Sequence, residues 1–242
     1  MQGISFVRHD KAVLSDVSAT VPARGLTCLL GTNGAGKTTL LRVVSGELKP
    51  TSGRYFIDST DASALSRKEL ARHFAVIPQN APIPPYLTVR EMVGLGRFKP
   101  RGSPKWRVSG QDRAKVDASL SRCRVEGLGD RRLDEVSGGE QRRAWLAFGL
   151  VSDKYFLVLD ETLDGMDVFG KRTFFELLKD IASRDKSIVL ASHDLDLVNE
   201  FADKIIVLVG GRVVFEGPPD SDLQKLLGSS PESAYIIPDK GK

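Results

Sequence analysis

One short segment constrains the fold of this chain more than any other. The segment LLGTNGAGKTTLLRVVSG, residues 29–46, places three glycines and a lysine between an apolar run and a helical pattern. Within it, Gly31, Gly36, Lys37 and Thr38 satisfy the spacing G-x-x-x-x-G-K-[ST]. Glycine lets backbone N–H groups approach a phosphate without interference from Cβ, and the N-terminus of a following helix adds positive field. The pattern therefore predicts a phosphate-binding loop between a strand and a helix, with a purely structural turn as the alternative.

The side chains of this loop indicate a nucleoside triphosphate as the ligand. Lys37 would place its charge on the β and γ phosphates, and the hydroxyl of Thr38 would bind Mg²⁺. We expect the nucleotide to contact the whole loop. Its residues are Gly31, Thr32, Asn33, Gly34, Ala35, Gly36, Lys37, Thr38 and Thr39.

Hydrophobic patterning predicts an α/β fold. Short β-rich apolar runs at residues 26–30, 155–160, 187–192 and 204–209 alternate with helical patterns, which is typical of a parallel sheet. Three further segments, at residues 3–8, 12–21 and 53–58, have the pattern of half-buried strands separated by turns. We expect them to form an antiparallel subdomain beside the parallel sheet.

Strand signals fade between residues 80 and 154, which predicts an inserted helical subdomain. Thr88 and Glu91 have the spacing of a capping box for a helix through Gly94. A second helix is predicted at residues 110–124 and a third after Gly139. The expected domains are a discontinuous core at 1–79 and 155–228, the helical subdomain at 80–154, and a short polar tail at 229–242.

A second motif supplies the carboxylates that triphosphate hydrolysis requires. The run YFLVLDE ends a predicted strand with Asp160 and Glu161. Asp160 is the candidate residue for holding Mg²⁺, and Glu161 is the candidate general base that orients and polarises the attacking water. The alternative is that two acids merely terminate a buried strand.

A third motif precedes that strand. In EVSGGEQRRAWLAFGL, a serine and two glycines open a helix, which makes a second candidate anion site. Taken alone, this segment is an ordinary N-cap and turn; its position relative to the other two motifs favours the anion site. Its residues are Ser137, Gly138, Gly139 and Glu140.

In this order, the motifs resemble the ATP-binding subunits of ABC transporters, from about Gly3 to Leu227. GTNGAGKT resembles the Walker A loop, YFLVLDE resembles Walker B with its catalytic glutamate, and VSGGE resembles the family signature. Gln79 stands at the Q-loop, Asp167 matches the D-loop acid, and His193 matches the switch histidine. The resemblance implies a P-loop NTPase (RecA-like) core, ATPase activity with ATP and Mg²⁺, and Thr38, Gln79 and Asp160 on the metal.

The resemblance also implies partners. In this family two ATPase subunits face each other head to tail, so the signature of one closes over the γ-phosphate held by the other. Segments such as ELARHFAVIPQ and TVREMVGLGR are most similar to the ATPases of importers for ferric siderophores, haem and cobalamin. We therefore expect a homodimer, integral membrane permease subunits and an extracellular substrate-binding protein. The expected location is peripheral, on the cytoplasmic face of the cell membrane.

Composition agrees with this interpretation. The chain has no apolar run of about 18 residues or more, and the spacing of Cys28 and Cys123 argues against a metal site or a disulfide framework. A net charge of +4 permits an acidic partner. The basic segment at residues 97–107 is either a solvated loop or a contact for anionic lipid or nucleic acid. We expect no nucleic acid partner, since only one aromatic, Trp106, interleaves with the charges.

Several residues depart from the family pattern. Val136 and Glu140 replace the usual leucine and glutamine of the signature, and the proline that commonly follows the catalytic glutamate is absent. The position that usually carries an aromatic ring for adenine offers only Arg8 and His9. Two alternatives to the importer subunit therefore stay open: a non-transport ABC ATPase, and a weakly hydrolysing nucleotide-binding regulatory subunit.

Overall fold

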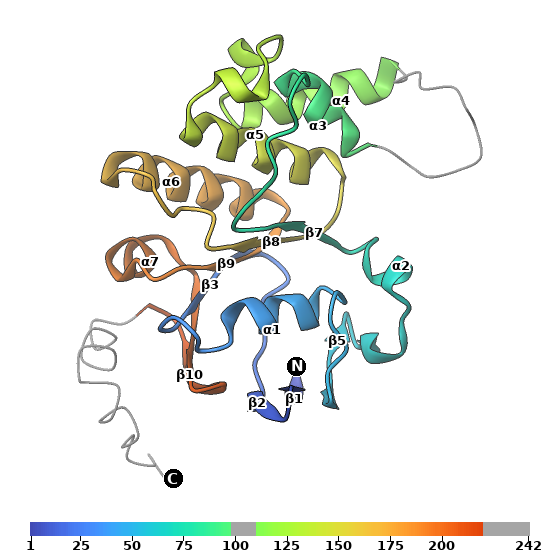
Figure 1. Cartoon of the computed structure of the whole chain (residues 1–242), viewed down its shortest axis with the longest axis vertical. Coiled ribbons are helices and arrows are strands. Elements are labelled where there is room, and N and C mark those ends of the chain that lie inside the picture. The colour runs from blue at the N-terminus through green and yellow to red at the C-terminus, as the bar shows by residue number, and fades with distance from the viewer. Residues whose placement is uncertain (98–109, 220–242) are drawn as a thin grey trace.

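The computed structural model describes residues 1–97 and 110–219. Its strands are β1 (Gln2–Arg8), β2 (Lys11–Val17), β3 (Gly25–Leu30), β4 (Ser52–Arg54), β5 (Phe56–Ile57), β6 (Thr60–Asp61), β7 (Phe74–Ile77), β8 (Phe156–Asp160), β9 (Ser187–Ala191), β10 (Lys204–Val209) and β11 (Arg212–Gly217). Its α-helices are α1 (Lys37–Val44), α2 (Arg67–Leu70), α3 (Val89–Leu95), α4 (Gly110–Arg122), α5 (Gly138–Val151), α6 (Val168–Arg184) and α7 (Leu195–Phe201). The predicted α/β fold class is confirmed (Figure 1).

A six-stranded sheet forms the core, in the order β11-β10-β3-β9-β8-β7. Five neighbouring strands, β10, β3, β9, β8 and β7, run parallel, and β11 closes one edge antiparallel to β10. A separate three-stranded antiparallel sheet has the order β2-β1-β4. Because parallel neighbours end at the same edge, the loops that follow β3, β7, β8 and β9 lie side by side.

Alternate residues of the parallel strands pack into two different hydrophobic clusters. In β8, Leu157 and Leu159 face one cluster, and Val158 faces the other. In β9, Leu190 and Val189 divide in the same way. Both faces of the sheet are therefore buried, as is usual for a parallel sheet, and this explains why its strands are continuous apolar runs.

The two clusters place the helices on opposite sides of the sheet. The first cluster contains side chains of α3, α4, α5, α6 and α7, and the second contains those of α1, β1 and β2. Figure 1 shows α3, α4 and α5 gathered at one end of the molecule, with α1, β1 and β2 across the sheet. The predicted capping box of α3 forms: Thr88 accepts from the Glu91 N–H, and the Glu91 carboxylate accepts from the Thr88 N–H.

Some predicted boundaries are wrong. The strand expected at 53–58 divides into β4 and β5, which belong to different sheets, because β4 pairs with β1 and β5 turns back to pair with β6. The strand expected at 12–21 ends at Val17, just after the left-handed backbone of Asp16 (φ 54°). The helix predicted at 110–124 ends at Arg122, before Arg124, which is also left-handed (φ 57°).

The helix predicted after Gly139, from Glu140, begins two residues earlier, at Gly138, because Ser137 is its N-cap. The division of the chain at 79/80 and at 154/155 stays a prediction. Most of the basic segment 97–107 and the whole tail 229–242 lie outside the described residues.

Two further observations concern the described part of the chain. None of its helices has the length and the apolar character needed to cross a membrane. Cys28 and Cys123 are free and buried, and burial raises the pKa of each thiol well above its usual range. These cysteines therefore act as small apolar residues of the core.

Helix α6 allows a direct test of the core, because it carries both buried and exposed phenylalanines. Phe175 is 0% exposed, whereas Phe169 is 80% exposed. We expect Phe175→Ala to lower the free energy of unfolding by about 3–5 kcal/mol, since it removes a buried ring and leaves a cavity. Phe169→Ala, the matched control, should change it by no more than about 0.5 kcal/mol. Urea denaturation of both variants measures this, and equal effects would contradict the packing described.

Candidate functional site

The phosphate-binding loop connects β3 to α1 through backbone conformations that exclude side chains. Gly36 has φ 103° and is the N-cap of α1. A Cβ on Gly31 would lie 2.4 Å from the carbonyl oxygen of Leu208, so even alanine would collide with backbone. No side chain caps α1, so its first N–H groups stay available to an anion. The loop therefore has the form that its sequence predicts.

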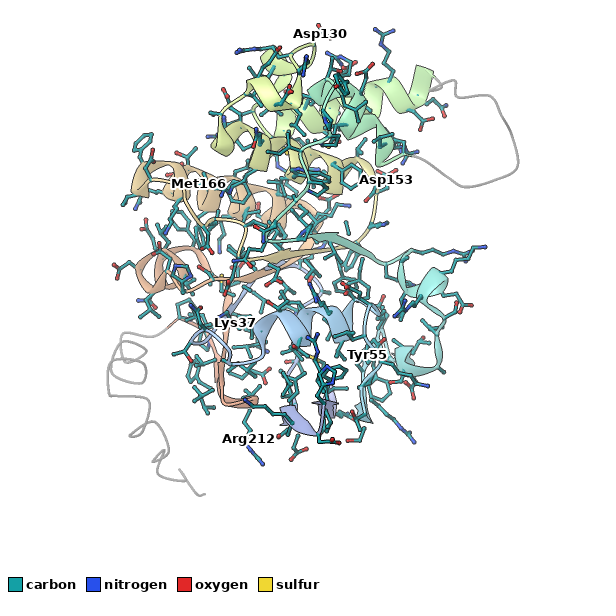
Figure 2. The ribbon with its side chains drawn as sticks, in the orientation of Figure 1. Lys37, Tyr55, Asp130, Asp153, Met166 and Arg212 are labelled. Atoms are coloured by element: carbon teal, nitrogen blue, oxygen red, sulfur yellow. The ribbon has the colours of Figure 1, made fainter. Side chains whose placement is uncertain are left out.

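Lys37, the first residue of α1, is buried in this loop (Figure 2). Its ammonium donates to the carbonyl oxygens of Gly31 at 2.8 Å and Thr32 at 3.2 Å. It also forms an ion pair with Glu161, whose Oε1 lies 2.9 Å from Nζ. A buried ammonium needs such partners, because an unpaired charge away from water is strongly unfavourable.

Thr38 and Asp160 form the candidate metal site. The Thr38 hydroxyl donates to Asp160 Oδ1 at 3.1 Å, although the two residues lie far apart in the sequence. Burial raises the pKa of the Asp160 carboxyl, and the nearby Glu161 adds to this rise. A hydroxyl and a carboxylate are hard oxygen donors, which suit Mg²⁺ when phosphate oxygens complete its shell.

Glu161 and Gln79 come from neighbouring strands and meet at the same edge of the sheet. Glu161 follows β8 in a left-handed backbone conformation (φ 45°), which is uncommon for a non-glycine residue. Gln79 follows β7, and its Nε2 donates to Glu161 Oε2 at 3.2 Å. Such backbone strain is typical of functional sites, where the surrounding structure holds it in place.

These residues line a cleft of about 740 Å³. Its lining residues are Val13, Gly31, Thr32, Asn33, Gly34, Gly36, Lys37, Thr38, Thr39, Gln79, Glu161, Asp164 and His193. The structure thus brings together the predicted phosphate loop, Q-loop, catalytic glutamate and switch histidine. Two predicted residues of the phosphate loop and metal site do not line the cleft. Ala35, within the phosphate loop, is buried, and Asp160 is buried and accepts a hydrogen bond from the Thr38 hydroxyl.

The signature residues do not line this cleft. Ser137 caps α5: its Oγ accepts from the Glu140 N–H at 3.4 Å, and its own N–H and hydroxyl donate to Glu140 Oε2 at 2.7 and 2.8 Å. Asp167 caps α6 in the same way, with Oδ1 accepting from the Gly170 N–H at 2.6 Å. Both caps precede a helix as the sequence indicates, and within one chain neither side chain reaches the phosphate loop.

The two residues considered for stacking on the nucleotide base lie outside the cleft. Arg8 and His9 are exposed at the turn between β1 and β2, and they do not line the cleft; Val13 of β2 does. Sequence reasoning also missed Asp164 in the cleft, and Arg142 of α5, which donates to the backbone carbonyl oxygens of Thr162 and Asp164. The only sequence signal for Asp164 was its position three residues after Glu161.

Comparison with known proteins agrees with this geometry. The family model described as ABC transporter matches residues 14–164, from β2 to Asp164. The chain belongs to the ABC transporter family. It is therefore an ATPase of the ATP-binding cassette type.

Individual relatives include import ATP-binding proteins. The petrobactin import ATP-binding protein YclP of Bacillus subtilis is 34% identical over 88% of this chain and 84% of its own length. The hemin import ATP-binding protein HmuV of Rhodococcus jostii is 33% identical over 93% of this chain and 76% of its own length. Among solved structures, cbiO1 of Clostridium perfringens, part of the ABC transporter complex cbiONQ, has a TM-score of 0.80 and 27% identity, covering 96% of this chain and 90% of its own. The predicted resemblance to siderophore, haem and cobalamin import ATPases is confirmed.

The capping box of the signature predicts a pH-dependent contribution to stability. The hydroxyl and N–H of Ser137 lower the pKa of Glu140 below its ordinary value of 4.5, so the carboxylate stabilises the folded state above that pH and loses this effect as the pH falls through the lowered pKa. We expect Glu140→Gln to cost about 0.5 kcal/mol at pH 7, because glutamine keeps the cap without its charge. The difference from the wild type should shrink as the pH falls below 4.5.

Urea denaturation between pH 7 and pH 3 measures that difference. Glu126→Gln, at an exposed position of the same region, is the matched control and should show little effect at any pH. A Glu140→Gln difference that stays constant across this range would contradict the charged cap.

Proposed function

We propose that this chain is the ATP-hydrolysing subunit of an ABC importer, working as a head-to-tail homodimer on a separate membrane permease. One observation carries the hydrolytic part: Lys37 and Glu161 are paired at 2.9 Å in a cleft that Gln79 and His193 also line. The transport part is supported by relatives that are import ATP-binding proteins.

In this proposal, Mg²⁺ is held by Thr38 and Asp160, with Gln79 as a third oxygen donor. When bound, the ion neutralises charge on the β and γ phosphates of ATP. The fit rests on the 3.1 Å contact between the Thr38 hydroxyl and Asp160 and on the hard oxygen atoms that both residues offer.

Side chains of the protein carry out the remaining steps of the proposed mechanism. The β and γ phosphates take the place of Glu161 on the Lys37 ammonium, which frees the Glu161 carboxylate to orient a water molecule and accept its proton. The water oxygen bonds to the γ-phosphorus as the bond from that phosphorus to the oxygen bridging to the β-phosphate breaks, so ADP and inorganic phosphate leave. His193 holds the γ-phosphate and the water, and Gln79 reports the nucleotide state towards the permease.

The signature residues act in trans in this proposal. Ser137, Gly138 and Gly139 open α5 away from the chain's own cleft, so a second subunit has to supply the same segment to complete each site. The N-terminus of a 14-residue helix gives this segment a positive field for the γ-phosphate. Asp167, at the start of α6, is the proposed D-loop acid at the subunit boundary.

The cargo class follows from the relatives. Relatives with 29–36% identity are ATP-binding proteins for import of petrobactin, hemin, cobalamin and iron(3+)-hydroxamate, and for transport of ferric enterobactin. We therefore propose a ferric siderophore, haem or cobalamin as the cargo, with an extracellular binding protein as a further partner. The subunit would lie on the cytoplasmic face of the membrane, bound to its permease.

Replacement of the proposed general base tests hydrolysis. We expect Glu161→Gln to reduce ATP turnover at least about a hundredfold, because the amide cannot accept the proton of the attacking water. Binding of Mg-ATP should persist, and ATP-dependent dimers should become easier to detect by size-exclusion chromatography. Glu176→Gln, on the exposed surface of α6, is the control and should keep turnover within about twofold. Near-normal turnover of Glu161→Gln would remove this residue from the mechanism.

Affinity capture tests transport. We expect the tagged chain, extracted from native membranes in mild detergent, to bring with it a polytopic permease and an extracellular binding protein, both identifiable by mass spectrometry. Ligand titration of that binding protein would then identify the cargo. Capture of ribosomal or DNA-bound proteins alone, from a soluble fraction, would overturn the importer and favour a non-transport ABC ATPase.

A further inference from the structure

Asp164 lies in the nucleotide cleft, although no motif assigns it a role. Its Oδ2 accepts a hydrogen bond from Gln79 Nε2 at 3.0 Å, and its Oδ1 lies 3.8 Å from Nδ1 of His193. The side chain is 43% exposed, on the wall of the cleft that also carries Glu161. Asp164 thus contacts two side chains to which the proposed mechanism gives a part in hydrolysis.

Hydrogen bonds from Arg142 hold the backbone around Asp164. Arg142, on the first turns of α5, donates to the carbonyl oxygens of Thr162 and Asp164, and also to that of Gly138 at 3.2 Å. On the other side, the Asp164 N–H donates to the Glu161 carbonyl oxygen at 3.5 Å. The carboxylate therefore projects into the cleft from a held segment that is tied to the helix of the signature.

The contact fixes which way the Gln79 amide points. A carboxylate only accepts hydrogen bonds, and Gln79 Nε2 donates to both Glu161 and Asp164. The NH₂ end of the amide is therefore directed at the two acids, and the carbonyl oxygen is directed away from them. A cation, or a hydrogen of water, needs that carbonyl oxygen, because the NH₂ end can only donate.

Glu161 and Asp164 have different roles in the proposed hydrolysis. In the proposed mechanism the Glu161 carboxylate turns to the attacking water and accepts its proton, and a protonated carboxyl is a weaker acceptor for Gln79. Asp164 has no such task, so its 3.0 Å hydrogen bond is the one that can persist through the reaction.

We propose that Asp164 is a positioning residue for ATP hydrolysis: it holds the Gln79 amide with its carbonyl oxygen directed away from the two acids. This inference rests on the proposed function and names a further residue of the same site. Asp164 touches neither phosphate nor water in this role; it acts through Gln79.

The negative charge of Asp164 distinguishes a positioning role from a role in nucleotide binding. Asp164 adds a carboxylate beside Glu161, in a cleft that has to accept a triphosphate of the same sign, so removing it takes away a repulsion rather than an attraction. The variant should therefore lose turnover while it keeps its affinity for Mg-ATP. A residue that served binding would lose both together.

A double-mutant cycle on the full chain is the decisive experiment. We expect Asp164→Ala to lower kcat about tenfold, with the Kd of Mg-ATP unchanged or lower, because one oriented hydrogen bond is lost. Asp164→Asn should keep at least about half of kcat, since its amide oxygen accepts the same bond from Gln79. In a Gln79→Ala background, Asp164→Ala should change kcat less than about twofold, because the partner it holds is already absent.

The matched control is Asp130→Ala. Asp130 is 93% exposed and pairs with Arg90 at 3.3 Å, and Figure 2 shows it at the far end of the helical region from Lys37. This variant should keep both kcat and affinity. Should Asp164→Ala unfold, Asp164→Leu has nearly the same shape without the acceptor, and melting temperatures identify which variants are folded.

The outcomes separate this inference from the function it rests on. Additive effects in the cycle, equal losses in the Asn and Ala variants, or a fall in affinity that matches the fall in kcat would overturn the role of Asp164 and leave the ATPase intact. A wild-type chain that binds Mg-ATP without hydrolysing it would overturn both proposals.

Discussion

The buried ammonium of Lys37 is the interaction on which the site depends. A charge with 4% exposure has to be paired, and here two loop carbonyl oxygens and Glu161 share that task. The same pairing occupies the Glu161 carboxylate, which is the general base of the proposed mechanism. ATP, by bringing its own negative charge to Lys37, would release Glu161 at the moment when its reaction partner arrives. In the proposed mechanism, nucleotide binding and activation of the general base are therefore linked through one ion pair.

Sheet topology makes this pairing possible. Lys37 follows β3, Glu161 follows β8, Gln79 follows β7, and His193 follows β9. Because these four strands are parallel and contiguous, their carboxyl ends meet at one edge and deliver all four side chains to one cleft. Hydrophobic burial on both faces holds the strands in this order, so the core fixes the geometry of the chemistry.

The helical region links the cleft to the proposed subunit boundary. Ser137 and Glu140 cap α5 outside the cleft, and Arg142 on the same helix clamps the segment that carries Asp164. A movement of α5 would therefore reach Gln79 through backbone carbonyl oxygens and one carboxylate. In the proposed head-to-tail dimer, this would connect the signature that closes one site to the acids of the other.

Elements whose signals are local were predictable from the amino-acid sequence. The glycines of the phosphate loop, the acids that end β8, the capping box of α3 and the N-cap of α5 each follow from a few neighbouring residues, so local spacing predicted them. The reciprocal bond from Glu140 that completes a capping box on α5 was seen only in the structure. Features that depend on distant pairing became visible only in the folded chain: the place of β7 at the sheet edge, the division of residues 53–58 between two sheets, and the presence of Val13, rather than Arg8 or His9, in the cleft. Asp164 belongs to this second group, because its contact with Gln79 joins residues 85 positions apart, and no local pattern encodes such a hydrogen bond.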